Sequence, residues 1–142
     1  MTRPAGGSTL PLLVFDGDCA FCTASIDWLA RTFPGAFDTV PYQRADLRSL
    51  GLTAQECHAR LQWLTDPSRS ADQEGTSRSG APAVAAVLRT GGRRRGGIVG
   101  AAARGIGAAA SCPPLSWLAA AGYAVVAANR SRLPGGTPAC AL

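Results

Sequence analysis

The order of elements at the start of the chain constrains the fold most. The run from Leu10 to Phe15 is apolar, and the turn residues Asp16-Gly17-Asp18 end it, which predicts a short buried strand. From Ala20 to Phe33 the apolar side chains recur at helical spacing until Pro34-Gly35 stops the pattern. Ala36 to Tyr42 is a second strand candidate. A strand, a helix and a strand in this order need a crossover connection, so the first two strands are predicted to be parallel.

Two further strands are predicted in the middle of the chain. Leu61 to Thr65 and Thr76 to Ser79 are separated by a polar segment that begins at Asp66-Pro67, which favours an antiparallel pair. Pro41 cannot donate a backbone hydrogen bond, so the second strand is expected at a sheet edge. The sequence therefore predicts an α/β fold with a four-stranded mixed sheet and helices packed on it.

Helices are predicted at three further places. Thr53-x-x-Glu56 forms a capping box before a helix from Ala54 to Arg60. A helix is expected from Gly80 to about Arg89, and another from Leu115 to Asn129 as a C-terminal extension. The last helix carries so many apolar side chains that we expect it to pack against the core of the domain.

The segment between these helices is predicted to be irregular. Arg93-Arg94-Arg95 lies between two Gly-Gly pairs, which is typical of a solvated loop. Ile98 to Ala110 is apolar but rich in glycine, which opposes a helix. With 142 residues the chain has room for one domain. We divide it into a flexible N-terminus (1–9), a core (10–90) and a Gly/Arg loop with a helical extension of the same domain (91–142).

Composition and charge argue against a disordered chain, a nucleic-acid-binding protein, a membrane protein and a secreted protein. Hydrophobic residues make up 46% of the chain and charged residues 16%, so it is not wholly disordered. The net charge is +5, but no aromatic residues interleave with the arginine run, and we expect no nucleic-acid partner. No apolar run is long enough for a transmembrane segment, and Leu10 to Phe15 is too short for a signal-peptide core. We therefore expect a cytoplasmic protein.

Two of the five cysteines have a spacing that suits redox chemistry. Cys19 follows the first strand and its turn, and Cys22 falls in the first turn of the next helix. The positive end of a helix lowers the pKa of a nearby thiol, and positions i and i+3 are within disulfide reach. Asp18 is the expected helix cap. Because Cys22 begins the apolar face of the helix, we expect Cys19 to be the more accessible sulfur.

The residues around this pair resemble a known family. Phe15-Asp16-Gly17-Asp18-Cys19-Ala20-Phe21-Cys22 is similar to the opening motif of the thioredoxin-like DCC family of thiol-disulfide oxidoreductases. The Asp-Cys-Cys pattern that names the family falls on Asp16, Cys19 and Cys22. Gly80-Ala81, Tyr123 and the segment from Ala127 to Leu133 resemble later landmarks of the family. In one respect the chain differs from general thioredoxins, because no proline stands just before Leu61.

The resemblance implies a thioredoxin-like fold and thiol–disulfide exchange as the reaction. Cys19 would attack a disulfide, Cys22 would resolve the mixed disulfide, and no cofactor would be needed. Asp16 either assists proton transfer from Cys22 or only shapes the turn. The expected partners are a thiol or disulfide substrate, taken to be a protein, and an electron-donating thiol system.

Other interpretations of the cysteines remain open on sequence alone. Cys19 and Cys22 could be half of a zinc site or inert thiols. The domain could also be a non-catalytic module that binds a protein or a membrane surface through its Gly/Arg loop and last helix. Cys57 suits a hydrophobic staple, and neither Cys112 nor Cys140 has an assigned role, although Cys140 could resolve a bond to Cys19.

Overall fold

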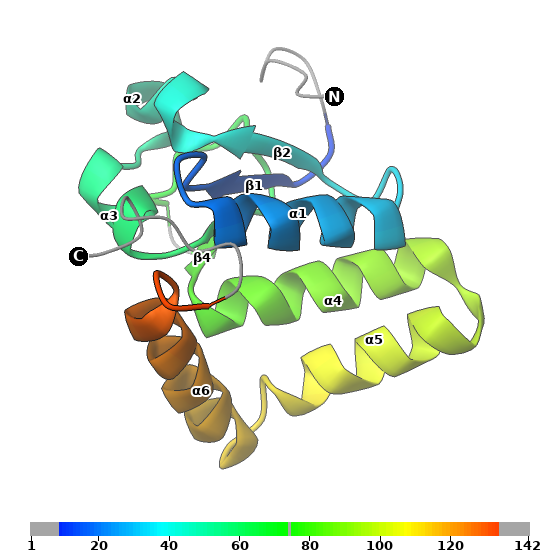
Figure 1. Ribbon diagram of the computed structural model, residues 1–142. Helices are drawn as coiled ribbons and strands as arrows, with labels where there is room; N and C mark the ends of the chain where they lie inside the picture. The colour runs from blue at the N-terminus through cyan, green and yellow to red at the C-terminus, as the bar shows by residue number, and fades with distance from the viewer. Residues whose placement is uncertain (1–8, 74, 134–142) are drawn as a thin grey trace.

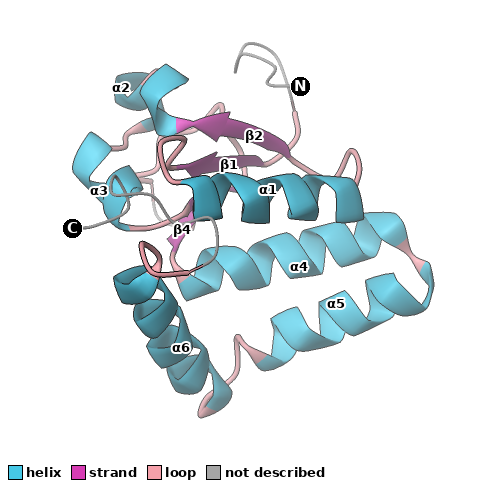
Figure 2. Ribbon diagram, viewed as in Figure 1, coloured by secondary structure: helices cyan, strands magenta, loops and turns pink. Residues whose placement is uncertain are grey.

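A four-stranded mixed sheet forms the centre of the molecule. The computed structural model describes residues 9–73 and 75–133. The strand order is β2-β1-β3-β4. β1 pairs in parallel with β2, and antiparallel pairs join β1 to β3 and β3 to β4 (Figure 2). The strands are β1 (Leu12–Phe15), β2 (Asp38–Pro41), β3 (Gln62–Leu64) and β4 (Ser77–Ser79). The α/β class, the mixed sheet and the edge position of β2 are confirmed, and the fold is thioredoxin-like.

Helices cover both faces of the sheet (Figure 1). They are α1 (Ala20–Thr32), α2 (Leu47–Leu50), α3 (Ala54–Ala59), α4 (Ala81–Arg95), α5 (Gly97–Ala109) and α6 (Leu115–Asn129), with a 3-10 turn η1 (Tyr42–Arg44). The capping box predicted before α3 is present, with Thr53 and Glu56 bonded to each other's backbone N–H groups. The short elements η1 and α2 were not predicted.

The alternation of side chains along β1 divides the core into two parts. Leu13 and Phe15 point to one face, where they join Ile26 of α1, Phe33 just after it and Val87 of α4. Leu12 and Val14 point to the other face, where they join Leu50 of α2 and Cys57 of α3. All four residues of β1 are buried, so this strand carries both halves of the core.

The predicted Gly/Arg loop is wrong, because α4 continues through it. Arg93, Arg94 and Arg95 form the last turn of α4, where cations suit the negative end of the helix. Arg95 Nη1 also donates to the carbonyl of Thr32 at the end of α1. The helix therefore crosses the boundary at residue 90 that separates the predicted core from its extension. Residues 1–8 of the expected flexible N-terminus, and Cys140, lie outside the described residues.

The glycine-rich segment after α4 is also a helix, because its glycines allow it to pack closely against α4. α5 lies against α4 so closely that a Cβ atom on Gly92 or on Gly100 would lie 2.5 Å from the other residue's carbonyl oxygen. A Cβ atom on Gly107 would lie 2.8 Å from the carbonyl oxygen of Ala85. The low helix propensity of glycine is thus outweighed by the close backbone contact that only glycine permits.

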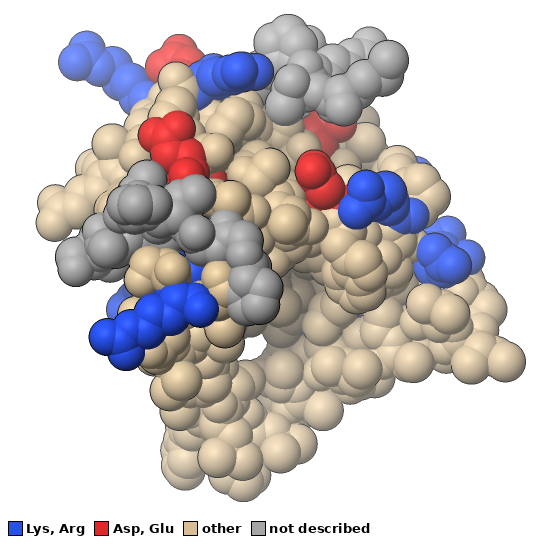
Figure 3. Space-filling model, viewed as in Figure 1, with Lys and Arg blue, Asp and Glu red and all other residues tan. Residues whose placement is uncertain are grey.

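The C-terminal helix has the predicted bounds but not the predicted burial. No residue of α6 is buried, and Trp117 and Leu118 are 71% and 68% exposed. The expectation of packing on the core is therefore wrong for these two side chains, whereas Tyr123 of the same helix is partly buried and accepts a hydrogen bond from the N–H of Leu61. The surface over α5 and α6 is almost uncharged in the view of Figure 3. Within the part of the chain that the structure describes, no helix has the length and hydropathy needed to cross a membrane.

The α4–α5 contact generates a prediction about stability. Gly100→Ala should lower the free energy of unfolding by about 1–3 kcal/mol, because its Cβ would collide with the backbone of α4. Gly105→Ala, on the open side of the same helix, should stabilise the protein by up to ~1 kcal/mol through helix propensity. Chemical denaturation of both variants measures the difference. Equal effects would contradict the close packing.

Candidate active site

The two cysteines lie where β1 turns into α1. Cys19 is the N-cap residue of α1, and its Sγ accepts a hydrogen bond from the backbone N–H of Cys22 at 3.3 Å. The two residues come within 2.8 Å of each other. The predicted cap, Asp18, is therefore wrong, since a cysteine sulfur occupies that position. The Cys19 sulfur therefore lies at the positive end of the α1 dipole, in contact with a first-turn N–H group.

The turn before Cys19 is held tightly against β2. A Cβ atom on Gly17 would lie 2.7 Å from the Cβ atom of Pro41, so a larger residue would push the two segments apart. The backbone N–H of Gly17 also donates to Gln43 Oε1 at 3.1 Å. The Asp-Gly-Asp sequence thus fixes the start of α1 relative to the end of β2.

The exposure of the two cysteines is the reverse of the expectation. Cys19 is 0% exposed, whereas Cys22 is partly exposed. Helical periodicity correctly put Cys22 on the apolar face of α1, since it packs against the core cluster there. That face, however, opens onto a cavity at Cys22, and the turn at residues 16–18 does not leave Cys19 accessible.

Asp16 is a buried carboxylate in contact with several polar groups. Its Oδ1 accepts from the backbone N–H of Asp18 at 3.1 Å and from Gln43 Nε2 at 2.9 Å. Its Oδ2 lies 2.9 Å from His58 Nδ1, but no well-aligned hydrogen bond reaches this oxygen from the described residues. This contact is an ion pair only when the imidazole is protonated. Asp16 shapes the turn through Oδ1 and leaves Oδ2 facing an imidazole.

His58 and Arg130 are two residues of the site to which the sequence patterns above assign no role. In the structure Arg130 is 5% exposed, and its Nη2 donates to the carbonyl oxygen of His58 at 2.9 Å. The signal available in the sequence was that His58 is the one histidine of the chain and follows Cys57 directly.

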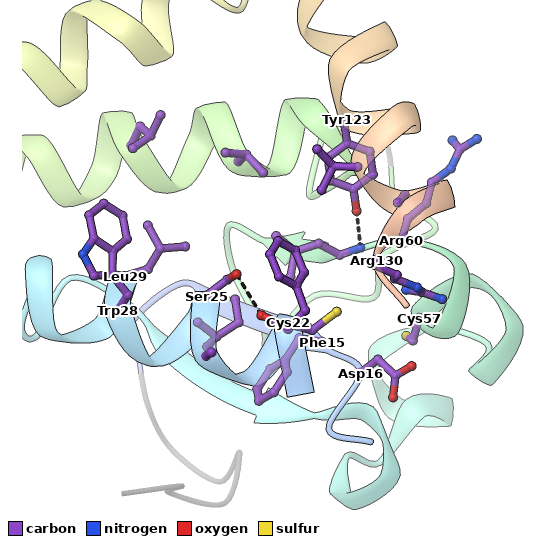
Figure 4. Close-up of a pocket in the computed structure, with 18 residues that line it drawn as sticks. Phe15, Asp16, Cys22, Ser25, Trp28, Leu29, Cys57, Arg60, Tyr123 and Arg130 are labelled. Atoms are coloured by element: carbon purple, nitrogen blue, oxygen red, sulfur yellow. Dashed lines mark hydrogen bonds between the residues drawn. The ribbon is translucent and has the colours of Figure 1, made fainter. Parts of the chain in front are cut away.

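A cavity of about 620 Å³ opens between α1, α4 and α6 (Figure 4). Cys22, Asp16 and Cys57 lie at one end of it, together with the arginines Arg60 and Arg130. The rest of the wall is mostly apolar. It consists of Phe15, Phe21, Ala24, Ser25, Ile26, Trp28, Leu29, Leu61, Val84, Leu88, Tyr123, Val126 and Ala127.

Tyr123 fastens α6 to the rest of the site. Its Oη accepts a hydrogen bond from the backbone N–H of Leu61 at 3.0 Å. The pKa of Tyr123 is raised, chiefly because burial removes water from the phenol. Gly80 has a φ of +63°, and a Cβ atom there would lie 3.3 Å from the ring of Tyr123. The glycine and tyrosine noted in the sequence thus meet beside the cavity.

The sequence model of the DCC1-like thiol-disulfide oxidoreductase family matches residues 13–136, which is most of the chain.

The chain belongs to this family. The resemblance seen in the sequence is therefore confirmed, and with it a thiol-disulfide redox function in general terms. No curated protein and no solved structure matches the chain.

The other cysteines of this DCC1-like chain differ from the pair in environment. Burial raises the pKa of Cys57 to about 11, and this residue belongs to the core cluster on the α2–α3 face. Cys112 is exposed between α5 and α6. Among the described residues, no three His, Cys, Asp or Glu side chains gather closely enough to hold a metal ion.

The environments of the thiols predict their order of alkylation. At pH 8 a thiol of pKa about 11 has on the order of a hundredfold less thiolate than an ordinary one. Iodoacetamide should therefore modify Cys22 and Cys112 well before Cys57, and peptide mass mapping of a brief reaction would measure this order. Early labelling of Cys57 would show that this thiol is accessible in solution and would contradict its position in the core.

Proposed function

We propose that the chain catalyses thiol–disulfide exchange with Cys19 and Cys22 as the redox couple. The observation that carries this proposal is the hydrogen bond from Cys22 N to Cys19 Sγ at the first turn of α1. It places the Cys19 sulfur against the backbone of Cys22, at a helix end that stabilises negative charge on sulfur, and residues three apart on a helix turn are within disulfide reach. Membership of the DCC1-like family supports the same chemistry.

Access and charge suggest different roles for the two sulfurs. Because Cys22 lines the cavity and Cys19 does not, we assign the attack on substrate to Cys22 and the resolving step to Cys19. These roles are the reverse of those expected from the sequence. The Cys22 thiolate attacks a disulfide R–S–S–R′, forms a bond to one sulfur and releases R′–S⁻, which takes up a proton. The Cys19 thiolate then attacks Cys22 Sγ, releases R–S⁻ and leaves a Cys19–Cys22 disulfide.

The same arrangement suits the reverse reaction. A substrate thiolate that enters the cavity would attack Cys22 Sγ of the disulfide, and Cys19 would leave as a thiolate. The N-terminus of a helix stabilises negative charge, so the position of Cys19 at the N-cap of α1 suits a leaving thiolate. The role of Cys19 is therefore to carry negative charge in both directions.

We assign to Asp16 the role of accepting the thiol proton of Cys22. Its carboxylate lines the same end of the cavity as Cys22, and His58, which is 29% exposed at its side chain, connects Oδ2 with the exterior. A buried carboxylate can accept the thiol proton before attack and return it to the leaving thiolate.

The reaction needs an electron donor but no bound cofactor. The two electrons taken up by the substrate come from two cysteine thiols, so a separate thiol system must reduce the Cys19–Cys22 disulfide again. We propose the cytoplasm as the location, because its thiol pools keep cysteines such as Cys57 and Cys112 reduced.

One observation favours a second candidate function. Trp117, Leu118 and Val125 of α6 are all more than half exposed, as a surface that binds another molecule would be. A non-catalytic interaction module would keep the fold and would not need a redox-active pair. Counting thiols in the native protein before and after mild oxidation separates the two functions, since exchange chemistry removes two.

Single substitutions in a Cys112→Ser, Cys140→Ser background test the roles of the pair. With bis(2-hydroxyethyl) disulfide, Cys19→Ser should accumulate a mixed disulfide on Cys22, because the one other cysteine left, Cys57, is buried and its pKa is raised to about 11. Cys22→Ser should lose nearly all of the reaction. Intact-mass spectrometry measures both. A trapped adduct on Cys19 in the Cys22→Ser variant would return the attacking role to Cys19.

Asp16→Asn tests the proton transfer. Asparagine can still accept the hydrogen bonds from Asp18 and Gln43 through its oxygen, so the turn should persist. Exchange near pH 7 should slow by about 10²-fold, in the range of general acid–base catalysis. The matched control is Asp18→Asn, which removes an exposed carboxylate nearby and should not slow the reaction. Stopped-flow rates equal to those of the unsubstituted protein would leave Asp16 a turn residue only.

A further inference from the structure

The sulfur that we assign to substrate attack lies in the wall of a cavity of small-molecule size. The volume of about 620 Å³ falls within the range of pockets that enclose small ligands. Cys22 is partly exposed there, near the turn that begins α1 (Figure 4). A ligand that fills the cavity therefore lies against a thiol, and the cavity determines which disulfides reach it.

The wall that extends away from Cys22 is apolar on three helices. α1 contributes Trp28 and Leu29, α4 contributes Leu88, and α6 contributes Val126. Trp28 is 58% exposed and Val126 is 43% exposed, so both retain surface that a ligand can cover. Removal of such surface from water favours binding in proportion to its area.

Away from the Cys22 end, where Asp16 Oδ2 has no well-aligned hydrogen bond, the polar groups of Ser25, Leu61 and Tyr123 in the wall have partners within the protein. Ser25 Oγ donates to the carbonyl of Phe21 at 2.8 Å. The N–H of Leu61 donates to Tyr123 Oη, and the carbonyl of Leu61 accepts from the N–H of Gly80 at 2.9 Å. A polypeptide loop that entered the cavity would leave its own N–H and C=O groups without partners, which is unfavourable for each buried group. An apolar ligand has no such groups to satisfy.

We infer that the cavity binds a small disulfide with apolar alkyl or aryl groups, and not the polypeptide disulfide expected from the sequence. The inference rests on the proposed function and specifies its substrate class. A disulfide R–S–S–R lies with R along α1 and α6 and one sulfur against Cys22. Two cysteine thiols and one R–S–S–R give one Cys19–Cys22 disulfide and two R–SH molecules, so atoms and electrons balance.

A series of disulfides of similar intrinsic reactivity tests the substrate class. The reduced protein, in the Cys112→Ser, Cys140→Ser background, is mixed with dimethyl, dibutyl or bis(2-hydroxyethyl) disulfide, or with oxidised glutathione. Each second-order rate constant is divided by that of free N-acetylcysteine with the same disulfide. The normalised rate with dibutyl disulfide should exceed that with dimethyl disulfide by roughly tenfold or more, from the added methylene groups alone.

Two matched substitutions on α6 link the preference to the cavity. Ala127 lines the cavity, and Ala127→Phe should reduce the dibutyl-to-dimethyl ratio at least fivefold. Ala121 is exposed on the same helix outside the cavity, and Ala121→Phe should leave the ratio unchanged. Val84→Phe fills the cavity from α4 and gives the same test if Ala127→Phe does not fold.

The outcomes separate this inference from the proposed function. A high ratio that is lost in the cavity-filling variants supports the inference. Equal normalised rates for dimethyl and dibutyl disulfide, or the highest rate with oxidised glutathione, would overturn the substrate class while leaving thiol–disulfide exchange intact. Failure of every disulfide to consume the two thiols would overturn both.

Discussion

Burial of β1 on both faces is the constraint on which the rest of the structure depends. Leu13 and Phe15 require cover from α1 and α4, and Leu12 and Val14 require cover from α2 and α3. The strand is thereby fixed in the centre of the sheet, and its last residue leads directly into the turn that carries Asp16. The start of α1 and the hydrogen bond between Cys22 and Cys19 follow from the position of that turn. The reactive pair is thus positioned by core packing.

Sequence patterns predicted those elements whose signals are local. The bounds of α6 and the capping box of α3 agree with the structure, because a proline break or a Thr-x-x-Glu spacing acts within one turn. The α4–α5 pair was missed because its glycines serve a contact between two helices, and propensity describes a helix alone. The same limit applies to Cys22. Periodicity assigns it to the apolar face of α1, but whether that face meets a core or a cavity depends on where α6 lies.

The polar part of the site could be predicted only in part, for the same reason. Asp16, Cys19 and Cys22 lie close together in the sequence, and their spacing indicated a common site. His58 and Arg130 join them across long separations in sequence, through the contact between His58 Nδ1 and Asp16 Oδ2 and the hydrogen bond from Arg130 to the His58 carbonyl. No spacing rule connects these positions. A lone histidine beside a cysteine on a short helix is equally compatible with a solvated position, and only the packing of α3 against β1 brings it to Asp16.

The attachment of α6 divides the protein into parts that can change independently. The helix contributes a wall of the cavity, yet it is held near the catalytic residues by side-chain contacts at Tyr123 and Arg130 to the short segment from His58 to Leu61. The sulfur pair and the buried carboxylate lie in the turn between β1 and α1 and in the first turn of α1. Substitutions along α6 between these two attachments can therefore alter the shape of the cavity without touching the groups that transfer electrons. Related chains with one chemistry could acquire different substrates by this route.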